Sequence, residues 1–179
     1  ISITDVSGGT ASESRHQSET LTIVDAQSAP TVTLAASATS IAEDGSDNVT
    51  VTATSSVKTY ANITVSLATS GTATDDTDYA VDDTITITAG SLTGTATFNP
   101  TSDSHYDATS NESATIAISG VSGGSASESG VQTASITITD NETAPTLSIA
   151  TNDTSLGEGD SDATLTATLS PNATYAAVT

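Results

Sequence analysis

Apolar residues alternate with serine and threonine along most of this chain. In residues 49–53, for example, valine or alanine occupies every second position and threonine the positions between. A period of two places successive side chains on opposite faces of the backbone, so this pattern predicts strands with one buried face. It predicts seven strands in the middle of the chain, around residues 32–34, 49–53, 63–67, 85–87, 96–98, 114–118 and 134–138. No stretch of useful length has the period of a helix.

The sequence also nearly repeats itself at an offset of 115 residues. ISITDVSGGTASES at 1–14 returns as IAISGVSGGSASES at 116–129, and LTIVDAQSAPTVTLA at 21–35 returns as ITITDNETAPTLSIA at 136–150. This spacing has the size of a domain and exceeds the 20 to 50 residues or so of solenoid repeats. We therefore expect a window from a longer protein with three parts: the last strands of one unit plus a linker (1–29), a complete unit (30–142), and a linker plus the first strands of a third unit (143–179).

Turn-forming residues separate the predicted strands, chiefly in 43–47, 69–83 and 120–130. Seven antiparallel strands in about 115 residues are typical of an immunoglobulin-like sandwich. The predicted fold class is therefore all-β, with tandem immunoglobulin-like (Greek-key) β-sandwich repeats. The core would be small, since it is built from valine, isoleucine, leucine and alanine with a single phenylalanine.

Charge narrows the possible partners. Two basic residues face 22 acidic ones, for a formal net charge of −20, which repels nucleic-acid phosphates and anionic lipids and attracts cations. We therefore exclude a nucleic-acid partner. No run approaches the roughly 20 apolar residues of a membrane helix, so we expect no membrane insertion in this part of the chain.

Cysteine is absent, which excludes disulfides and thiolate metal sites and leaves carboxylates as the abundant ligands for hard cations. The acidity suits a protein bathed in salt, either exported or in a salty cytoplasm, and we favour export to a bacterial or archaeal cell surface. Six of the seven asparagines lie in Asn-x-Ser/Thr. This pattern suits a glycosylated surface protein, but it also arises by chance in threonine-rich strands.

Catalytic patterns are not found in the sequence. The two histidines, His16 and His105, fall in predicted loops without a nucleophile elbow nearby, and Gly8-Gly9 and Gly123-Gly124 lack the lysine of a phosphate-binding loop. We interpret the glycine pairs as hairpin turns and the protein as a non-enzyme. The tyrosines are too scattered for a carbohydrate platform, and Tyr79 is expected to pack against the sandwich.

Five stretches of the complete unit together resemble the Calx-beta domain. They are SIAEDG at 40–45, SGTAT at 70–74 leading to Asp78-Tyr79, ITAGS at 87–91, the acidic segment 103–112, and ITITDNE at 136–142. The resemblance spans the whole unit. Its specificity comes from the order in which the five stretches occur along the chain, because any one of them alone would be a weak signal. It implies an immunoglobulin-like sandwich that binds Ca2+ at one tip, where loops meet the linker to the next domain.

Carried over position by position, the resemblance places calcium ligands at Glu43, Asp78, Asp103, Asp107, Glu112, Asp140 and Glu142. Three departures predict fewer or weaker ions: Ser104 follows Asp103 where the family has a second acid, the segment between Asp107 and Glu112 is two residues longer, and Asn141 interrupts the closing acids. Four further loop acids are interpreted as solvated turn residues: Asp75, Asp76, Asp82 and Asp83.

These observations favour a calcium-stabilised structural spacer repeat of a large exported adhesin or extracellular fibre. Its partners would be neighbouring repeats of the same chain, held at fixed angles by ions at the domain tips and linkers. Two alternatives remain open: a self-assembling filament subunit joined to other copies through strand edges, and an accessory or glycan-binding module beside a catalytic domain elsewhere in the protein.

Overall fold

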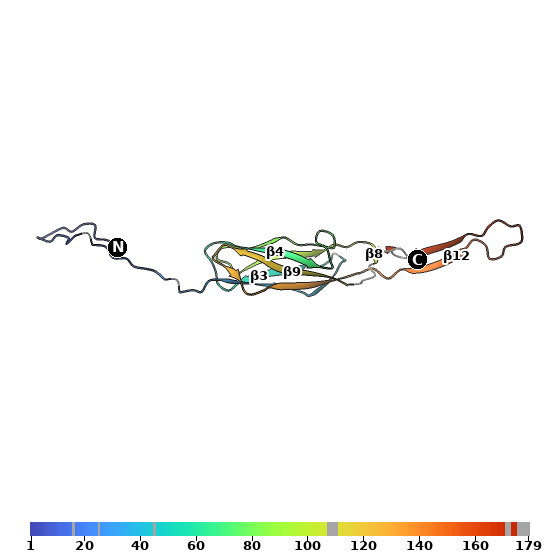
Figure 1. Cartoon of the computed structure of the whole chain (residues 1–179), viewed down its shortest axis with the longest axis horizontal. Helices are drawn as coiled ribbons and strands as arrows, with labels where there is room; N and C mark the ends of the chain where they lie inside the picture. The colour runs from blue at the N-terminus through green and yellow to red at the C-terminus, as the bar shows by residue number, and fades with distance from the viewer. Residues whose placement is uncertain (16, 25, 45, 107–110, 171–172, 175–179) are drawn as a thin grey trace.

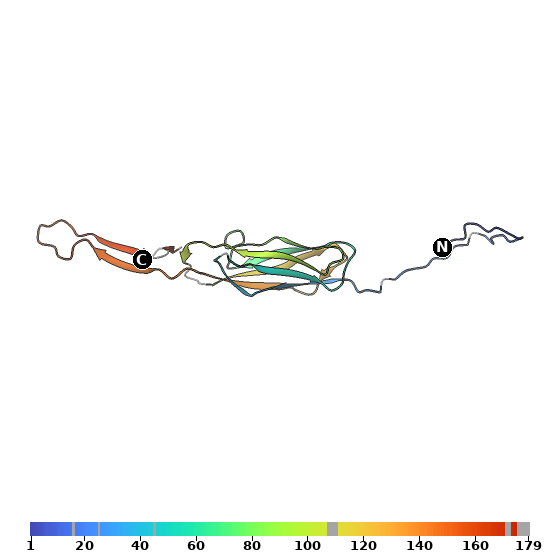
Figure 2. The same ribbon diagram turned by 180° about the vertical axis from the view of Figure 1, so that it is seen from behind.

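One β-sandwich forms the body of the protein, and the two ends of the chain extend from its opposite ends (Figures 1 and 2). The computed structural model describes residues 1–179 apart from 16, 25, 45, 107–110, 171–172 and 175–179. Within that part of the chain, no helix has the length and hydrophobicity needed to span a membrane. The all-β fold class predicted from the alternating pattern is confirmed.

Two five-stranded sheets face each other in the sandwich. One has the strand order β10-β1-β3-β7-β5 and the other β2-β11-β9-β4-β6. Because β3 and β7 pair in the first sheet while β4 and β6 between them belong to the second, the connections cross between the layers as in a Greek key. The strands of the two sheets are β1 (Thr31–Ala36), β2 (Ser40–Ala42), β3 (Val49–Ser55), β4 (Ile63–Gly71), β5 (Tyr79–Ala80), β6 (Thr84–Ile87), β7 (Thr93–Pro100), β9 (Asn111–Ser122), β10 (Ser127–Glu128) and β11 (Thr133–Thr139).

All seven predicted strands are present, as β1, β3, β4, β6, β7, β9 and β11, and the pairs among them are antiparallel. The pattern missed the short strands of two or three residues, β2, β5 and β10, and also β8 (His105–Tyr106). A segment this short has no detectable period. The turns expected over 69–83 and 120–130 are correspondingly interrupted by β5 and β10 and begin later, after Gly71 and Ser122.

The first two strands of the unit, β1 and β2, belong to different sheets. β1 pairs with β3 in one sheet, and after three residues β2 pairs in parallel with β11 in the other. In this parallel register Ala42 lies opposite Thr139. The backbone therefore leaves the sandwich at Glu43 and at Asp140 from adjacent positions.

The core is made of small and branched side chains with two aromatic rings. Tyr79 and Phe98 are the largest fully buried residues, and their rings stack with centroids 4.5 Å apart at an interplanar angle of 23°. The expectation that Tyr79 packs against the sandwich is confirmed. The buried apolar side chains of the core cluster all lie between Val32 and Ile138, so this unit has a hydrophobic core of its own.

The segments outside the sandwich are more open. At the C-terminal end, β12 (Thr146–Thr151) and β13 (Leu165–Ser170) form an antiparallel hairpin, and the backbone of β14 (Ala173–Thr174) pairs in parallel with β8. β12 begins 115 residues after β1, and the β12–β13 pair has the same antiparallel sense as β1–β3. In the described part of residues 1–29 the predicted strands are replaced by a single antiparallel bridge between Ser2 and Ser18. The apolar residues there are exposed, and a lone strand pair without a packed face is at best marginally stable.

Candidate metal centre

Three carboxylates meet at the end of the sandwich from which the chain continues into β12. Glu43 follows β2, and Asp140 and Glu142 follow β11. One oxygen from each carboxylate lies within 4.8 Å of the others, and all three side chains are half-buried. The parallel pairing of β2 with β11 brings them together from positions about 100 residues apart in the chain.

The backbone fixes this group in place. The Glu43 amide donates to the Thr139 carbonyl at 3.1 Å, which continues the pairing of the two strands by one residue. The Glu142 amide donates to Asp140 Oδ1 at 2.7 Å, which closes a tight turn over Asn141. Both bonds draw the carboxylates toward a common point.

Asn141 belongs to the same group, although the sequence suggested that it interrupts the site. With the amide nitrogen facing the acids, it donates to Glu142 Oε2 at 2.7 Å and to Glu43 Oε1 at 3.2 Å. Rotating the amide by half a turn would present its oxygen at the same place, and an amide oxygen is an accepted calcium ligand. The sequence could have indicated this, because Asn141 stands directly between two predicted ligands, Asp140 and Glu142.

Burial, together with the neighbouring acids, sets the electrostatics of the group. Burial raises the pKa of Glu43 to about 8, with further contributions from a hydrogen bond to Glu142 and from the charges of Glu142, Asp103 and Asp140. Burial and the neighbouring Asp140 also raise the pKa of Glu142. In the absence of an ion, these acids therefore retain a proton that an isolated glutamate would lose.

No lysine or arginine is placed to neutralise the group. The sequence contains only Arg15 and Lys58. Arg15 lies in the N-terminal segment. Lys58 follows the end of β3, whereas the start of β3, at Val49, pairs with Phe98 close to the end of β7 that leads to Asp103. Repulsion among these carboxylates must be offset by protons or by a cation from solution.

Asp103 lies beside the three carboxylates. Its charge raises the pKa of both Glu43 and Glu142, although its oxygens lie outside the 4.8 Å group. Asp103 Oδ1 accepts a 2.6 Å hydrogen bond from the His105 amide and lies 3.7 Å from His105 Nδ1. His105 lies in the two-residue strand β8 and not in a loop as predicted, and 41% of its side-chain surface is exposed. His16 lies outside the described residues.

Among the described residues, neither Asp78 nor Glu112 is part of the three-carboxylate group. Asp78 closes a turn: its Oδ2 accepts from the Thr74 amide at 2.6 Å, and its own amide donates to the Thr74 carbonyl. Glu112 is half-buried in β9, opposite Ile138 of β11. Asp107 lies outside the described residues.

The acids interpreted as solvated turn residues fall into two pairs. Asp82 and Asp83 are exposed, as predicted. Asp76 is exposed as well, whereas Asp75 is half-buried and accepts hydrogen bonds from the Thr69 hydroxyl and the Asp76 amide. Both pairs belong to the long connection between β4 and β6, so neither carries an acid of the group around Glu43.

The raised pKa of Glu43 predicts a pH-dependent stability of the ion-free protein. The native state keeps a proton up to a pKa of about 8, whereas the unfolded chain releases it near 4.5. The unfolded state therefore binds fewer protons across this window, and the free energy of unfolding falls as the pH rises. In EDTA, the melting temperature should be higher at pH 5.5 than at pH 8.5. Glu43→Gln should flatten this slope, and a melting temperature that rises with pH would contradict the assignment.

Comparison with known proteins rests on structure, because the sequence matches no protein-family model and no curated protein. The crystal structure of the apo form of the Calx CBD1 domain superposes with a TM-score of 0.50 at 16% identity, covering 63% of this chain and 99% of that one. The crystal structure of CBD12 from CALX1.2 gives a TM-score of 0.51 at 14% identity, covering 77% of this chain and 68% of that one. The fold is Calx-beta-like. At this identity the likeness concerns the fold, so the chemistry of the site must be argued from the residues of this chain.

The acidic group of the Calx-beta-like domain has the chemistry of a site for a hard cation. Its ligands are all oxygens, since the chain has no cysteine, and three half-buried carboxylates meet there. Two of them, Glu43 and Glu142, have raised pKa values. Calcium takes six to eight oxygens from carboxylates, amides and backbone carbonyls. The three carboxylates, the Asn141 amide and the nearby Asp103 offer a set of this kind.

Proposed function

We propose that this chain is a calcium-stabilised structural spacer of a large exported adhesin or extracellular fibre. The observation that carries the proposal is the group formed by Glu43, Asp140 and Glu142 at the point where the sandwich continues into the next strands. Calcium at this point would replace the proton shared by the carboxylates. It would join the ends of β2 and β11 through one centre.

A bound ion would stiffen the junction between consecutive units. Asp103 lies beside the acidic group and starts the segment that leads into β8. The backbone of β8 in turn pairs with β14, which follows the next hairpin. Neutralising the acids would order this segment and the linker together, so a tandem array would behave as a rod that projects distant parts of the protein.

Short edges favour a spacer over a laterally assembling filament. The outermost strands of the two sheets are β10, β5, β2 and β6, and each has only two to four residues. Long, flat, unpaired edges are what promote growth by strand addition, and short edge strands are a common protection against it. The strong net negative charge also opposes lateral packing of copies.

Thermal unfolding of the whole chain in calcium and in EDTA tests the proposal, with light scattering recorded on the same samples. At a calcium concentration one hundred times the dissociation constant, binding to the folded state alone contributes about 2.7 kcal/mol. For a unit of this size that corresponds to a rise in melting temperature on the order of 10 °C. The molecular mass should stay constant.

Each other outcome has a definite meaning. A calcium-dependent increase in mass would favour the filament. An unchanged melting temperature would show that the acids form only a solvated surface, and the spacer would then not depend on calcium. Magnesium at the same ionic strength is the control, because it demands a tighter octahedral site and should have a smaller effect.

A further inference from the structure

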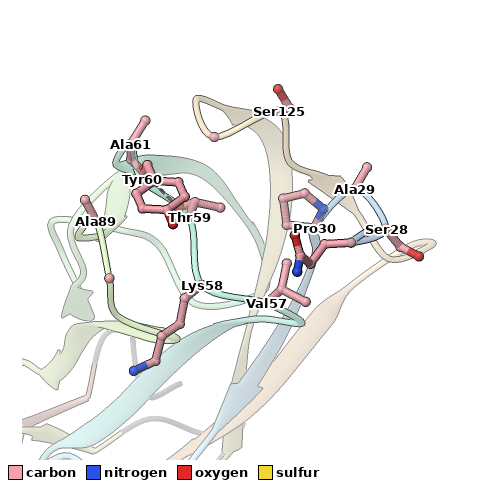
Figure 3. Close-up of a pocket in the computed structure, with 13 residues that line it drawn as sticks. Ser28, Ala29, Pro30, Val57, Lys58, Thr59, Tyr60, Ala61, Ala89 and Ser125 are labelled. Carbon is pink, nitrogen blue, oxygen red and sulfur yellow. Dashed lines mark hydrogen bonds between the residues drawn. The ribbon is translucent and has the colours of Figure 1, made fainter. Parts of the chain in front are cut away.

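A groove opens at the end of the sandwich where β1 begins, opposite the end where β2 and β11 lead to the acidic group. Figure 3 shows the residues that line it. It has a volume of about 1050 Å³ and lies between the incoming linker at residues 27–30 and the loop at residues 57–61. Residues from two further turns, Gly90 and Gly124 among them, complete its walls. The groove is therefore built by the incoming linker and three separate loops of the unit.

Backbone contacts hold the walls of this groove in shape. The Gly90 amide donates to the Thr59 carbonyl at 2.8 Å, and the Ala89 amide donates to Asn62 Oδ1 at 2.9 Å. Gly124 approaches the same loop so closely that a Cβ atom there would lie 3.0 Å from Thr59 Cγ2. The surface is thus formed before any partner arrives, which lowers the entropic cost of docking.

Two side chains on the groove suggest what it receives. Tyr60 is fully exposed on the loop at residues 57–61, and Lys58 extends from the same loop. Tyrosine is enriched at the centres of protein interfaces, where a large ring is covered at little entropic cost. Lys58 is one of only two basic residues in a chain of net charge −20, so an acidic partner would complement it.

At the acidic end of the unit, the equivalent of the 57–61 loop in the next repeat pairs with β8. Residues 173–174 lie 115 positions after Lys58 and Thr59, at the corresponding place in the next repeat. Their backbone forms β14, which pairs with β8 in the register Ala173 with His105 and Thr174 with Tyr106. This β8 segment begins two residues after Asp103, beside the acidic group.

We propose that the groove of each unit receives the acidic end of the preceding unit. The occupant is the segment equivalent to β8, which would pair with the backbone of Lys58 and Thr59 as β8 pairs with β14. Tyr60 packs beneath it, and Lys58 faces the acids that flank it. The proposal rests on the spacer function, because it requires consecutive units. It identifies the surface of the following unit that contacts the acidic end of the preceding unit.

A chain of two complete units tests this docking. Residues 1–142 are followed directly by residues 28–179, so that Glu142 leads into Ser28-Ala29-Pro30 as it natively leads into Thr143-Ala144-Pro145. The native sequence has no cysteine, so Tyr106→Cys in the first copy and Thr59→Cys in the second report only on the proposed contact. We expect this pair to form a disulfide under mild oxidation. Tyr106→Cys paired with Thr95→Cys, on the exposed middle of β7, is the matched control.

Side-chain variants separate docking from simple proximity. Tyr60→Ala in the second copy should slow the cross-linking about tenfold, the effect of losing an interface anchor worth about 1.4 kcal/mol. Lys58→Ala should slow it less, and added salt should remove that difference. Cross-linking no faster than in the Thr95→Cys control, or unaffected by Tyr60→Ala, would overturn the proposal.

Melting the same two-unit chain with and without calcium distinguishes the two proposals. A calcium-dependent rise without selective cross-linking would retain the calcium site and reject the groove. Selective cross-linking without a calcium response would retain the docking and reject stiffening by ions. Spin labels at the same two positions give the distance between the units in either case.

Discussion

Changing Glu43 to glutamine should remove most of the calcium-dependent rise in melting temperature while stabilising the protein in EDTA. The substitution keeps the shape of the side chain and deletes one charge from a group of half-buried carboxylates. Relief of repulsion stabilises the ion-free state, whereas loss of a ligand weakens calcium binding. At pH 8 the variant should therefore melt above the wild type in EDTA and below it in calcium.

Asp82→Asn is the matched control for this prediction. It also removes one carboxylate charge, but Asp82 is exposed in the connection between β5 and β6. Its calcium response should equal that of the wild type, a rise on the order of 10 °C at saturating ion. Equal losses in the two variants would mean that calcium acts through the overall charge of the chain and not through the group around Glu43.

Phe98→Ala should be the most damaging single change in the core. Phe98 is the only phenylalanine in the chain, is fully buried, and stacks on Tyr79 at 4.5 Å. Replacing a buried phenylalanine by alanine removes its transfer free energy and leaves a cavity, at a cost of about 3–5 kcal/mol. For a unit of this size, the melting temperature should fall by roughly 10–20 °C in both calcium and EDTA.

Phe98→Leu separates loss of volume from loss of the ring. It keeps most of the apolar volume and should lower the free energy of unfolding by only about 1 kcal/mol. Urea unfolding of the wild type and both variants measures the difference at constant temperature. If alanine and leucine cost the same, the cavity argument fails, and the stacking on Tyr79 would account for the stability instead.

The strands were predictable because the alternation of apolar and hydroxyl residues is nearly uninterrupted. Val49, Val51 and Ala53 face the core, as their period of two requires, while the threonines between them face outward or lie half-buried. β2, β5 and β8 were missed because they are formed by long-range pairing and not by local pattern. β2 is a strand because it reaches β11, almost 100 residues later in the chain.

The candidate site was predictable only in part. The resemblance carried over seven acids, and the structure collects Glu43, Asp140 and Glu142, with Asp103 beside them. Asp78 was predicted as a loop acid like the others, but its carboxylate accepts a hydrogen bond from the Thr74 amide and closes a turn. Whether an acid caps a turn or faces a shared point depends on the backbone around it, which composition does not reveal.

The sequence by itself determined the all-β class, the repeat of 115 residues and an acidic surface with almost no basic residues to neutralise it. These properties follow from the order and kind of side chains along the chain. Only the tertiary structure decided that Glu43 meets Asp140 and Glu142, and that Lys58 and Tyr60 lie on a groove at the opposite end. Such proximity depends on strand register and on crossings between sheets, which are set by packing of the whole core and have no local signature.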